Sequence, residues 1–122
     1  MKLLLTLTLA ALMSAAAFAE GPVRHVVHFK FKPDATAEQV QQVVAAFQAL
    51  TGKIKEIESF EAGTNVSPEG LDKGFKHCWV LGFHSEKDRD IYLHHPDHVA
   101  FANLVKPLLD DVLVVDFIPT KP

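Results

Sequence analysis

Residues 23–31 read VRHVVHFKF, and apolar or aromatic side chains recur at every second position of this stretch. Alternation with a period of two is typical of a β-strand with one face in a hydrophobic core. The positions that would face the core are Val23, His25, Val27, Phe29 and Phe31. The stretch therefore predicts a core strand, and His25 gives that strand a side chain able to transfer protons near neutral pH.

A helix is predicted directly after this strand. Pro33 ends the strand, and Thr36 with Gln39 three residues later matches a capping box. One helical stripe follows, made of Val40, Val43, Val44, Phe47 and Leu50. The pattern predicts an amphipathic helix that ends near Gly52.

Two further strands are predicted in the middle of the chain. The first covers residues 57–62, and the turn-rich residues 63–70 separate it from the second. The second covers residues 75–84, where the alternation returns. Its predicted inner face consists of Phe75, His77, Trp79, Leu81 and Phe83.

The last part of the chain predicts an interrupted helix and a final strand. Ser85 is a suitable N-cap, and Pro96 must end or kink the helix that it opens. A second helical piece is expected over about residues 97–109. Residues 112–118 are almost all β-branched or apolar, which predicts a strand buried on both faces.

The predicted order βαββαβ fits a ferredoxin-like α+β fold, in which an antiparallel four-stranded sheet carries its helices on one face. The other face of that sheet would expose apolar side chains, and such a patch usually marks an interface. Its members would be Val26, Val80, Leu113, Val115 and Phe117. We therefore expect a homodimer in which two sheets pack face to face around a two-fold axis.

The start of the chain predicts a secretory signal peptide. Lys2 is followed by an uncharged, Leu/Ala-rich run over residues 3–18, and Ala17-Phe18-Ala19 is an A-x-A cleavage site. The run is too short to be favoured as a membrane span. We expect cleavage after Ala19, a mature domain over residues 20–122, an exported location in periplasm or medium, and no membrane attachment after cleavage.

Composition limits the classes of function. The chain has 122 residues, 48% of them hydrophobic and 22% charged, which suits one globular domain. Without Lys2, 11 basic residues face 15 acidic ones, and this net charge of −4 argues against nucleic acid as a partner. Cys78 is the single cysteine, so the chain forms no intrachain disulfide and must be stabilised by packing.

Several segments together resemble the stress-responsive A/B barrel (Dabb) domain family of the dimeric α/β barrel superfamily. The segment His95-Pro96-Asp97-His98-Val99, shortly after Tyr92, is the most specific of them. The others are residues 23–32, the turn Gly63-Thr64-Asn65, residues 74–77 and residues 114–117. The resemblance implies the same ferredoxin-like fold and the same dimer.

The resemblance also implies a candidate site. The family includes plant stress proteins, members without known activity, and a plant polyketide cyclase that catalyses an aldol condensation without metal or cofactor. The tyrosine and catalytic histidine of that enzyme match Tyr92 and His98, and its other pocket histidines match His25 and His77. Asp116 lies at the matching position of the last strand. The ligand-binding wall would include Val44, Phe47 and Trp79.

Each candidate residue also has a structural interpretation. His25 and His77 either line a cavity or are core histidines whose ring nitrogens are hydrogen-bonded. Asp116 could accept the second ring proton of His98 and so make a general base, or the two could belong to a structural network with Tyr92. His94 and His98 have the i, i+4 spacing of metal ligands, but Pro96 breaks the helix between them, and no metal or cofactor is expected.

Two classes of function remain open from the sequence. The first is an exported, stress-related homodimer that binds a small apolar or aromatic ligand in a cavity lined by histidine and tyrosine. The second is a cofactor-free, polyketide-cyclase-like enzyme in which His98 is the general base and Tyr92 the hydrogen-bond donor. The export signal favours the first, because polyketide cyclisation usually takes place beside its synthase inside the cell.

Overall fold

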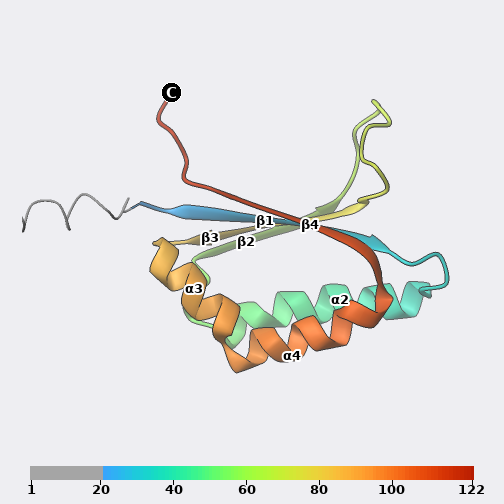
Figure 1. Ribbon diagram of the computed structural model, residues 1–122, viewed down its shortest axis with the longest axis horizontal. Helices are drawn as coiled ribbons and strands as arrows, with labels where there is room; N and C mark the ends of the chain where they lie inside the picture. Colours follow the sequence, from blue (N-terminus) through green and yellow to red (C-terminus); the bar gives the residue numbers. More distant parts are fainter. Residues whose placement is uncertain (1–20) are drawn as a thin grey trace, which may run out of the picture.

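The computed structural model describes residues 21–122, which form one sheet with helices on one side (Figure 1). The predicted signal peptide lies outside the described residues. The elements follow in the order β1 (Val23–Phe31), α2 (Ala37–Ala49), the 3-10 turn η1 (Leu50–Gly52), β2 (Ser59–Thr64), β3 (His77–Phe83), α3 (Glu86–His94), α4 (Pro96–Val105), the 3-10 turn η2 (Lys106–Leu108) and β4 (Leu109–Phe117). The predicted α+β, ferredoxin-like order βαββαβ is confirmed.

The sheet is antiparallel and has the strand order β2-β3-β1-β4, so β1 lies in its interior and β4 at an edge. His25 of β1 is paired with Leu81 on one side and Asp116 on the other. Two residues further along β1, Val27 is paired with Trp79 and Val114. Because paired residues share a face of the sheet, the register places Asp116 beside His25.

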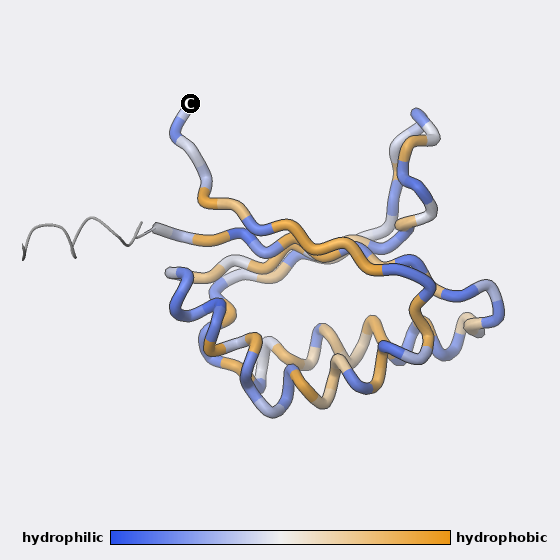
Figure 2. Tube along the Cα trace, viewed as in Figure 1, coloured by the Kyte–Doolittle hydropathy of each residue, from blue (hydrophilic) through white to orange (hydrophobic). Residues whose placement is uncertain are grey.

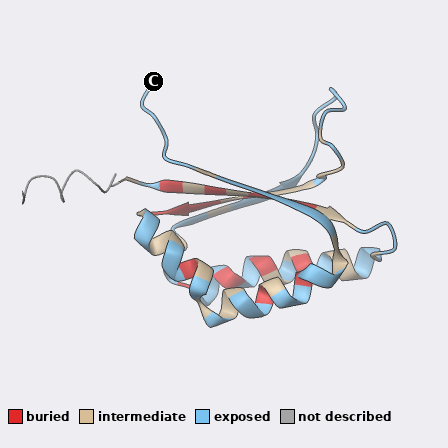
Figure 3. Cartoon of the chain, viewed as in Figure 1, coloured by how far each residue is buried: buried red, intermediate tan, exposed pale blue. Residues whose placement is uncertain are grey.

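The core lies between α2 and the strands β1 and β3, where Figure 3 shows the buried residues of the sheet. Thr36 caps α2 as predicted, since its Oγ1 accepts from the Gln39 backbone N–H at 3.1 Å. Phe47 of α2 stacks on Trp79 with ring centroids 4.8 Å apart, and Phe29 lies 4.7 Å from Trp79. Burial of these aromatic rings is the main stabilising contribution in this half of the molecule.

The break between α3 and α4 follows the capping residues. Ser85 caps α3, because its Oγ accepts from the Asp88 backbone N–H at 3.1 Å. His95 ends α3 in an extended conformation and caps α4 through its Nδ1, which accepts from the Asp97 backbone N–H at 3.1 Å. Pro96 then occupies the first turn of α4, where a proline needs no N–H partner. The predicted break at Pro96 is confirmed.

Three predicted boundaries need correction. The second strand begins at Ser59, because Ile57 belongs to a turn in which its N–H donates to the Ile54 carbonyl. The third strand begins at His77, because the Phe75 N–H donates to the Asp72 carbonyl in another turn. The second helical piece ends at Val105, and a 3-10 turn leads from it into β4.

The prediction that the last strand is buried on both faces is wrong. β4 begins at Leu109 and lies at the edge of the sheet, where its apolar residues remain exposed on both faces (Figures 2 and 3). Leu113, Val115 and Phe117 lie on the open face of the sheet and are 44%, 50% and 48% exposed. Within residues 21–122, no helix is both long enough and apolar enough to cross a membrane.

Candidate functional site

A cavity of about 440 Å³ lies on the helix side of the sheet, between β1 and β4 below α3 and α4. One end carries the polar side chains His25, Arg89, Tyr92, His98 and Asp116. The remaining wall is largely apolar and includes Phe29, Phe47, Phe101, Val112 and Val114. Apolar walls with a few convergent polar groups are typical of small-molecule sites.

The cavity is open beside the edge strand. Val112 and Val114 point toward the helices, yet they remain 47% and 49% exposed. Neither α3 nor α4 covers them, because these helices stand apart from β4 at this position. The inner face of β4 is therefore an accessible apolar wall.

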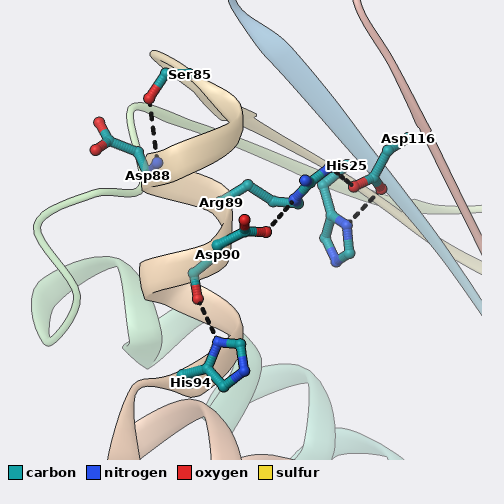
Figure 4. A network of polar contacts seen from close by, with 7 residues as sticks. All are labelled: His25, Ser85, Asp88, Arg89, Asp90, His94 and Asp116. Atoms are coloured by element: carbon teal, nitrogen blue, oxygen red, sulfur yellow. Dashed lines mark hydrogen bonds and ion pairs between the residues drawn. The ribbon is translucent and has the colours of Figure 1, made fainter. Parts of the chain in front are cut away.

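Asp116 joins a strand residue and a helix residue at the polar end of the cavity (Figure 4). Its Oδ1 lies 2.6 Å from Nδ1 of His25, and its Oδ2 accepts from Nη1 of Arg89 at 2.9 Å. A carboxylate only accepts hydrogen bonds, so Nδ1 of His25 donates to Asp116. In the neutral ring this contact fixes the tautomer and leaves Nε2 as an acceptor.

Arg89 is held by two carboxylates. Its Nε donates to Oδ1 of Asp90 at 3.0 Å, in addition to the contact with Asp116. Burial disfavours the charged guanidinium, but the hydrogen bonds to Asp116 and Asp90 outweigh this effect and raise the pKa of Arg89. The arginine is thus a permanent cation whose charge is already neutralised.

His98 and Tyr92 lie beside this network, with ring centroids 4.5 Å apart and ring planes inclined at 47°. Nδ1 of His98 lies 3.0 Å from the Leu93 carbonyl and must donate to it, which leaves Nε2 as an acceptor. Burial lowers the pKa of His98, and therefore its imidazole is neutral at pH 7. Burial raises the pKa of Tyr92, so its hydroxyl keeps its proton.

The predicted pairing of His98 with Asp116 is wrong. The carboxylate pairs with His25 and Arg89 instead, and His98 finds its acceptor in the Leu93 carbonyl at the end of α3. The register explains this result, because β1 and β4 are neighbours and His25 lies directly opposite Asp116. His98 lies on α4, which the strand pairing does not position.

Three residues expected at the site lie elsewhere. His77 contacts Phe31 with ring centroids 5.1 Å apart, and burial lowers its pKa. Trp79 is in the aromatic core, and Val44 packs against the same core from α2. All three belong to the half of the molecule under α2, on the far side of β1 from the cavity. The structure brings His25, Phe47, Tyr92, His98 and Asp116 to the cavity.

Sequence reasoning missed Arg89 and the apolar outer wall of the cavity. Arg89 precedes Tyr92 by three residues, and residues at i and i+3 share a helix face, so this spacing could have revealed it. The wall residues Val112 and Val114 carried no such signal, because an exposed valine and a buried one look alike in a sequence.

The histidines around Pro96 are occupied by local contacts. Nδ1 of His94 lies 2.9 Å from the Asp90 carbonyl, while His95 caps α4 and His98 contacts Leu93. Among the residues from 21 to 122, no group of three or more His, Cys, Asp or Glu side chains is placed to hold a metal ion.

Comparison with known sequences shows similarity over nearly the whole described chain. The family model of the stress responsive A/B barrel domain matches residues 23–119. A stress-response A/B barrel domain-containing protein of Arabidopsis thaliana is 35% identical over 103 residues, covering 84% of this chain and 94% of the plant protein. Olivetolic acid cyclase of Cannabis sativa is 25% identical over 99 residues, covering 81% and 98%.

Solved structures are similar to this chain over a comparable length. The hydroxynitrile lyase from Passiflora edulis superimposes with a TM-score of 0.79 at 25% identity, covering 85% of this chain and 98% of the enzyme. A dimeric ferredoxin-like protein of unknown function from Thermobifida fusca gives a TM-score of 0.70 at 29% identity, covering 84% and 94%. The matched length includes all four strands and both sides of the cavity.

Proposed function

We propose that this chain, which belongs to the stress responsive A/B barrel domain family, is an exported homodimer that binds a small, largely apolar molecule. Its membership of the family confirms the resemblance predicted from the sequence. The observation that carries the proposal is the accessible apolar wall of Val112 and Val114, which leads to the polar end of a cavity of about 440 Å³.

The dimer is supported by the open face of the sheet. Leu113, Val115 and Phe117 form an apolar surface there, and monomeric proteins seldom leave such a surface uncovered. The similar proteins from Thermobifida fusca and Bacteroides fragilis are described as dimeric. A second copy packed face to face would cover this surface without closing the cavity, which lies on the opposite side of the sheet.

The polar end of the cavity limits the chemistry of the ligand. His98 offers an Nε2 acceptor, the neutral form of His25 offers a second one, and Tyr92 offers a hydroxyl donor. A ligand with a carbonyl oxygen and an acidic C–H or O–H group would satisfy both kinds of partner. We therefore expect an apolar molecule with a carbonyl or hydroxyl group at one end. Export rests on the signal-like residues 1–19.

Native mass spectrometry of the mature protein, starting at Glu20 and purified from its own export compartment, tests the proposal. We expect a dimer that carries an additional small mass. A monomer, or a dimer that carries no additional mass and takes up no added 1-octanol, would overturn the proposal.

A second candidate function, cofactor-free acid–base catalysis, is favoured by one observation. His98 is neutral, fixed in one tautomer, and adjacent to a protonated tyrosine, which are the requirements for a general base beside a hydrogen-bond donor. Two of the similar proteins are a cyclase and a lyase by name.

The corresponding step is proton transfer next to a carbonyl. Nε2 of His98 would remove the α-proton, and the C–H electron pair would move into an enolate. Tyr92 would donate a hydrogen bond to the enolate oxygen, which lowers the energy of the charge that develops there. Return of the proton from His98 would complete the cycle without any redox change.

Exchange of the α-protons of 4-phenylbutan-2-one in D2O, followed by NMR, tests this candidate. A His98→Gln variant should catalyse this exchange roughly 10²–10⁴-fold more slowly than the wild type. His94→Gln is the matched control, because His94 makes the same kind of contact with a helix carbonyl outside the cavity. Equal exchange in wild type and His98→Gln would leave ligand binding as the function.

A further inference from the structure

The cavity has unlike charges at its two ends. At the polar end, the single guanidinium of Arg89 faces the carboxylates of Asp90 and Asp116, so the group carries an excess of negative charge. At the other end the wall includes Lys106, which is exposed and makes no ion pair with any residue between 21 and 122. A ligand with a negative group would therefore be repelled at the first end and attracted at the second.

Lys106 and His98 are separated by the length of a helix. His98 lies in the first turn of α4, and Lys106 directly follows its last residue. Eight residues at 1.5 Å each put the two positions roughly 12 Å apart along the helix axis. Between them the wall is apolar and is formed by Phe101, Val105 and the facing Val112 of β4.

β4 repeats this arrangement in the opposite direction. It begins at Leu109, next to Lys106, and reaches the polar end of the cavity at Asp116. Its inward residues Val112 and Val114 lie between these points and are the exposed apolar wall described above. An extended apolar chain on this wall would run from the lysine to the histidines.

We propose that the ligand is an amphiphilic carboxylate, with its negative group at Lys106, its apolar chain on Val112 and Val114, and its other end beside Tyr92 and His98. This inference rests on the proposed function, because it names the class of molecule that the same cavity binds. Among the residues that the structure describes, Lys106 and the paired Arg89 are the lysine and arginine side chains that line the cavity. One available positive charge matches one negative charge, which favours a carboxylate over a phosphate dianion. Arg89 does not compete for the negative group, since its donors are already directed to two carboxylates.

Calorimetric titration of the mature protein with nonanoate and with 1-octanol tests the inference. Both probes carry the same eight-carbon alkyl chain, so their affinities differ only through the head group. We expect nonanoate to bind about fivefold more tightly than 1-octanol, the upper range for an exposed ion pair. The preference should decrease at high salt, because added ions screen an exposed charge.

Variants test whether Lys106 causes the preference for the carboxylate over 1-octanol. Lys106→Gln should abolish this preference, and Lys106→Glu should bind octylammonium more tightly than 1-octanol. Lys53→Gln is the control, because Lys53 is an exposed residue at the end of η1 that does not line the cavity. 1-Octanol should bind the wild type and all three variants alike.

The outcomes separate this inference from the proposed function. If 1-octanol binds but nonanoate binds no more tightly, or if Lys106→Gln and Lys53→Gln behave alike, the carboxylate inference is overturned and the binding function stands. If neither probe binds, both are overturned.

Discussion

The strands β3 and β4 both flank β1, and both turn apolar side chains toward the helices, yet their environments differ completely. Trp79, Leu81 and Phe83 of β3 are 2%, 0% and 0% exposed, whereas Val112 and Val114 of β4 are about half exposed. Phe47 of α2 packs on Trp79 with ring centroids 4.8 Å apart, and Tyr92 of α3 lies 5.0 Å from Phe83. Above β4, α3 and α4 leave a cavity.

This difference shows how one fold provides both a stable core and a binding site. The half under α2 supplies the packing that holds the sheet together. The half at β4 can stay open because the fold does not depend on filling it. In the open half, the polar side chains of His25, Arg89 and Asp116 satisfy one another.

The largest effect is expected from truncation in the packed half. Leu81→Ala removes a fully buried side chain, and the free energy of unfolding should fall by roughly 2–5 kcal/mol. Val114→Ala on the open strand should cost about 1 kcal/mol or less. Urea unfolding at one protomer concentration compares the two variants. Equal losses would mean that the two halves are packed alike.

A smaller effect is expected from the polar end of the cavity. Asp116→Asn removes a charged acceptor from both His25 and Arg89, and hydrogen bonds to charged groups contribute roughly 1.5–3 kcal/mol to stability. Asp110→Asn is the control, because Asp110 pairs with Lys30 at 3.4 Å on the surface and should cost about 1 kcal/mol at most. If thermal unfolding shows that Asp110→Asn lowers the stability more than Asp116→Asn does, the contacts of Asp116 with His25 and Arg89 have no stabilising role.

The pH dependence of stability should reveal the buried state of His98. Its pKa is lowered in the folded protein, so below the usual 6.5 the unfolded chain takes up a proton that the folded chain does not. The free energy of unfolding should therefore fall as the pH decreases from 6.5 toward the lowered pKa. A His98→Gln variant lacks this contribution. Chemical unfolding at a series of pH values should show the difference between the two proteins changing over this range; a constant difference would contradict the burial of His98.

The smallest effect is expected at the cysteine. Cys78 lies on the open face of β3 and is half-buried, and burial raises the pKa of its thiol, which disfavours the reactive thiolate. Cys78→Ser should leave the mass of the dimer unchanged under oxidising conditions, as measured by light scattering after size exclusion. Dissociation of this variant would show that a disulfide, and not packing, joins the two copies.

The fold could be predicted largely from local patterns. The alternation in residues 23–31 and the capping box at Thr36 are local signals, and both elements formed where they were expected. β4 shows the limit of this approach. A run of valines predicts a strand, but its burial depends on the order of strands in the sheet and on the helix above it.

The candidate site was predictable only in part for the same reason. His25, Tyr92, His98 and Asp116 do meet at one cavity, but the partner of Asp116 depends on the register between β1 and β4. His77 has the same position on β3 that a cavity residue would have on β4, so the alternation alone could not separate them.

The most direct test of the comparison uses two adjacent residues of β4. Val114 and Val115 are equally exposed, but Val114 faces the cavity and Val115 the open face of the sheet. Native mass spectrometry of Val114→Lys and Val115→Lys, each with added 1-octanol, should show an empty dimer for the first and a monomer for the second. If both variants remain dimers, or if both dissociate, the two faces of β4 do not have the separate roles assigned to them.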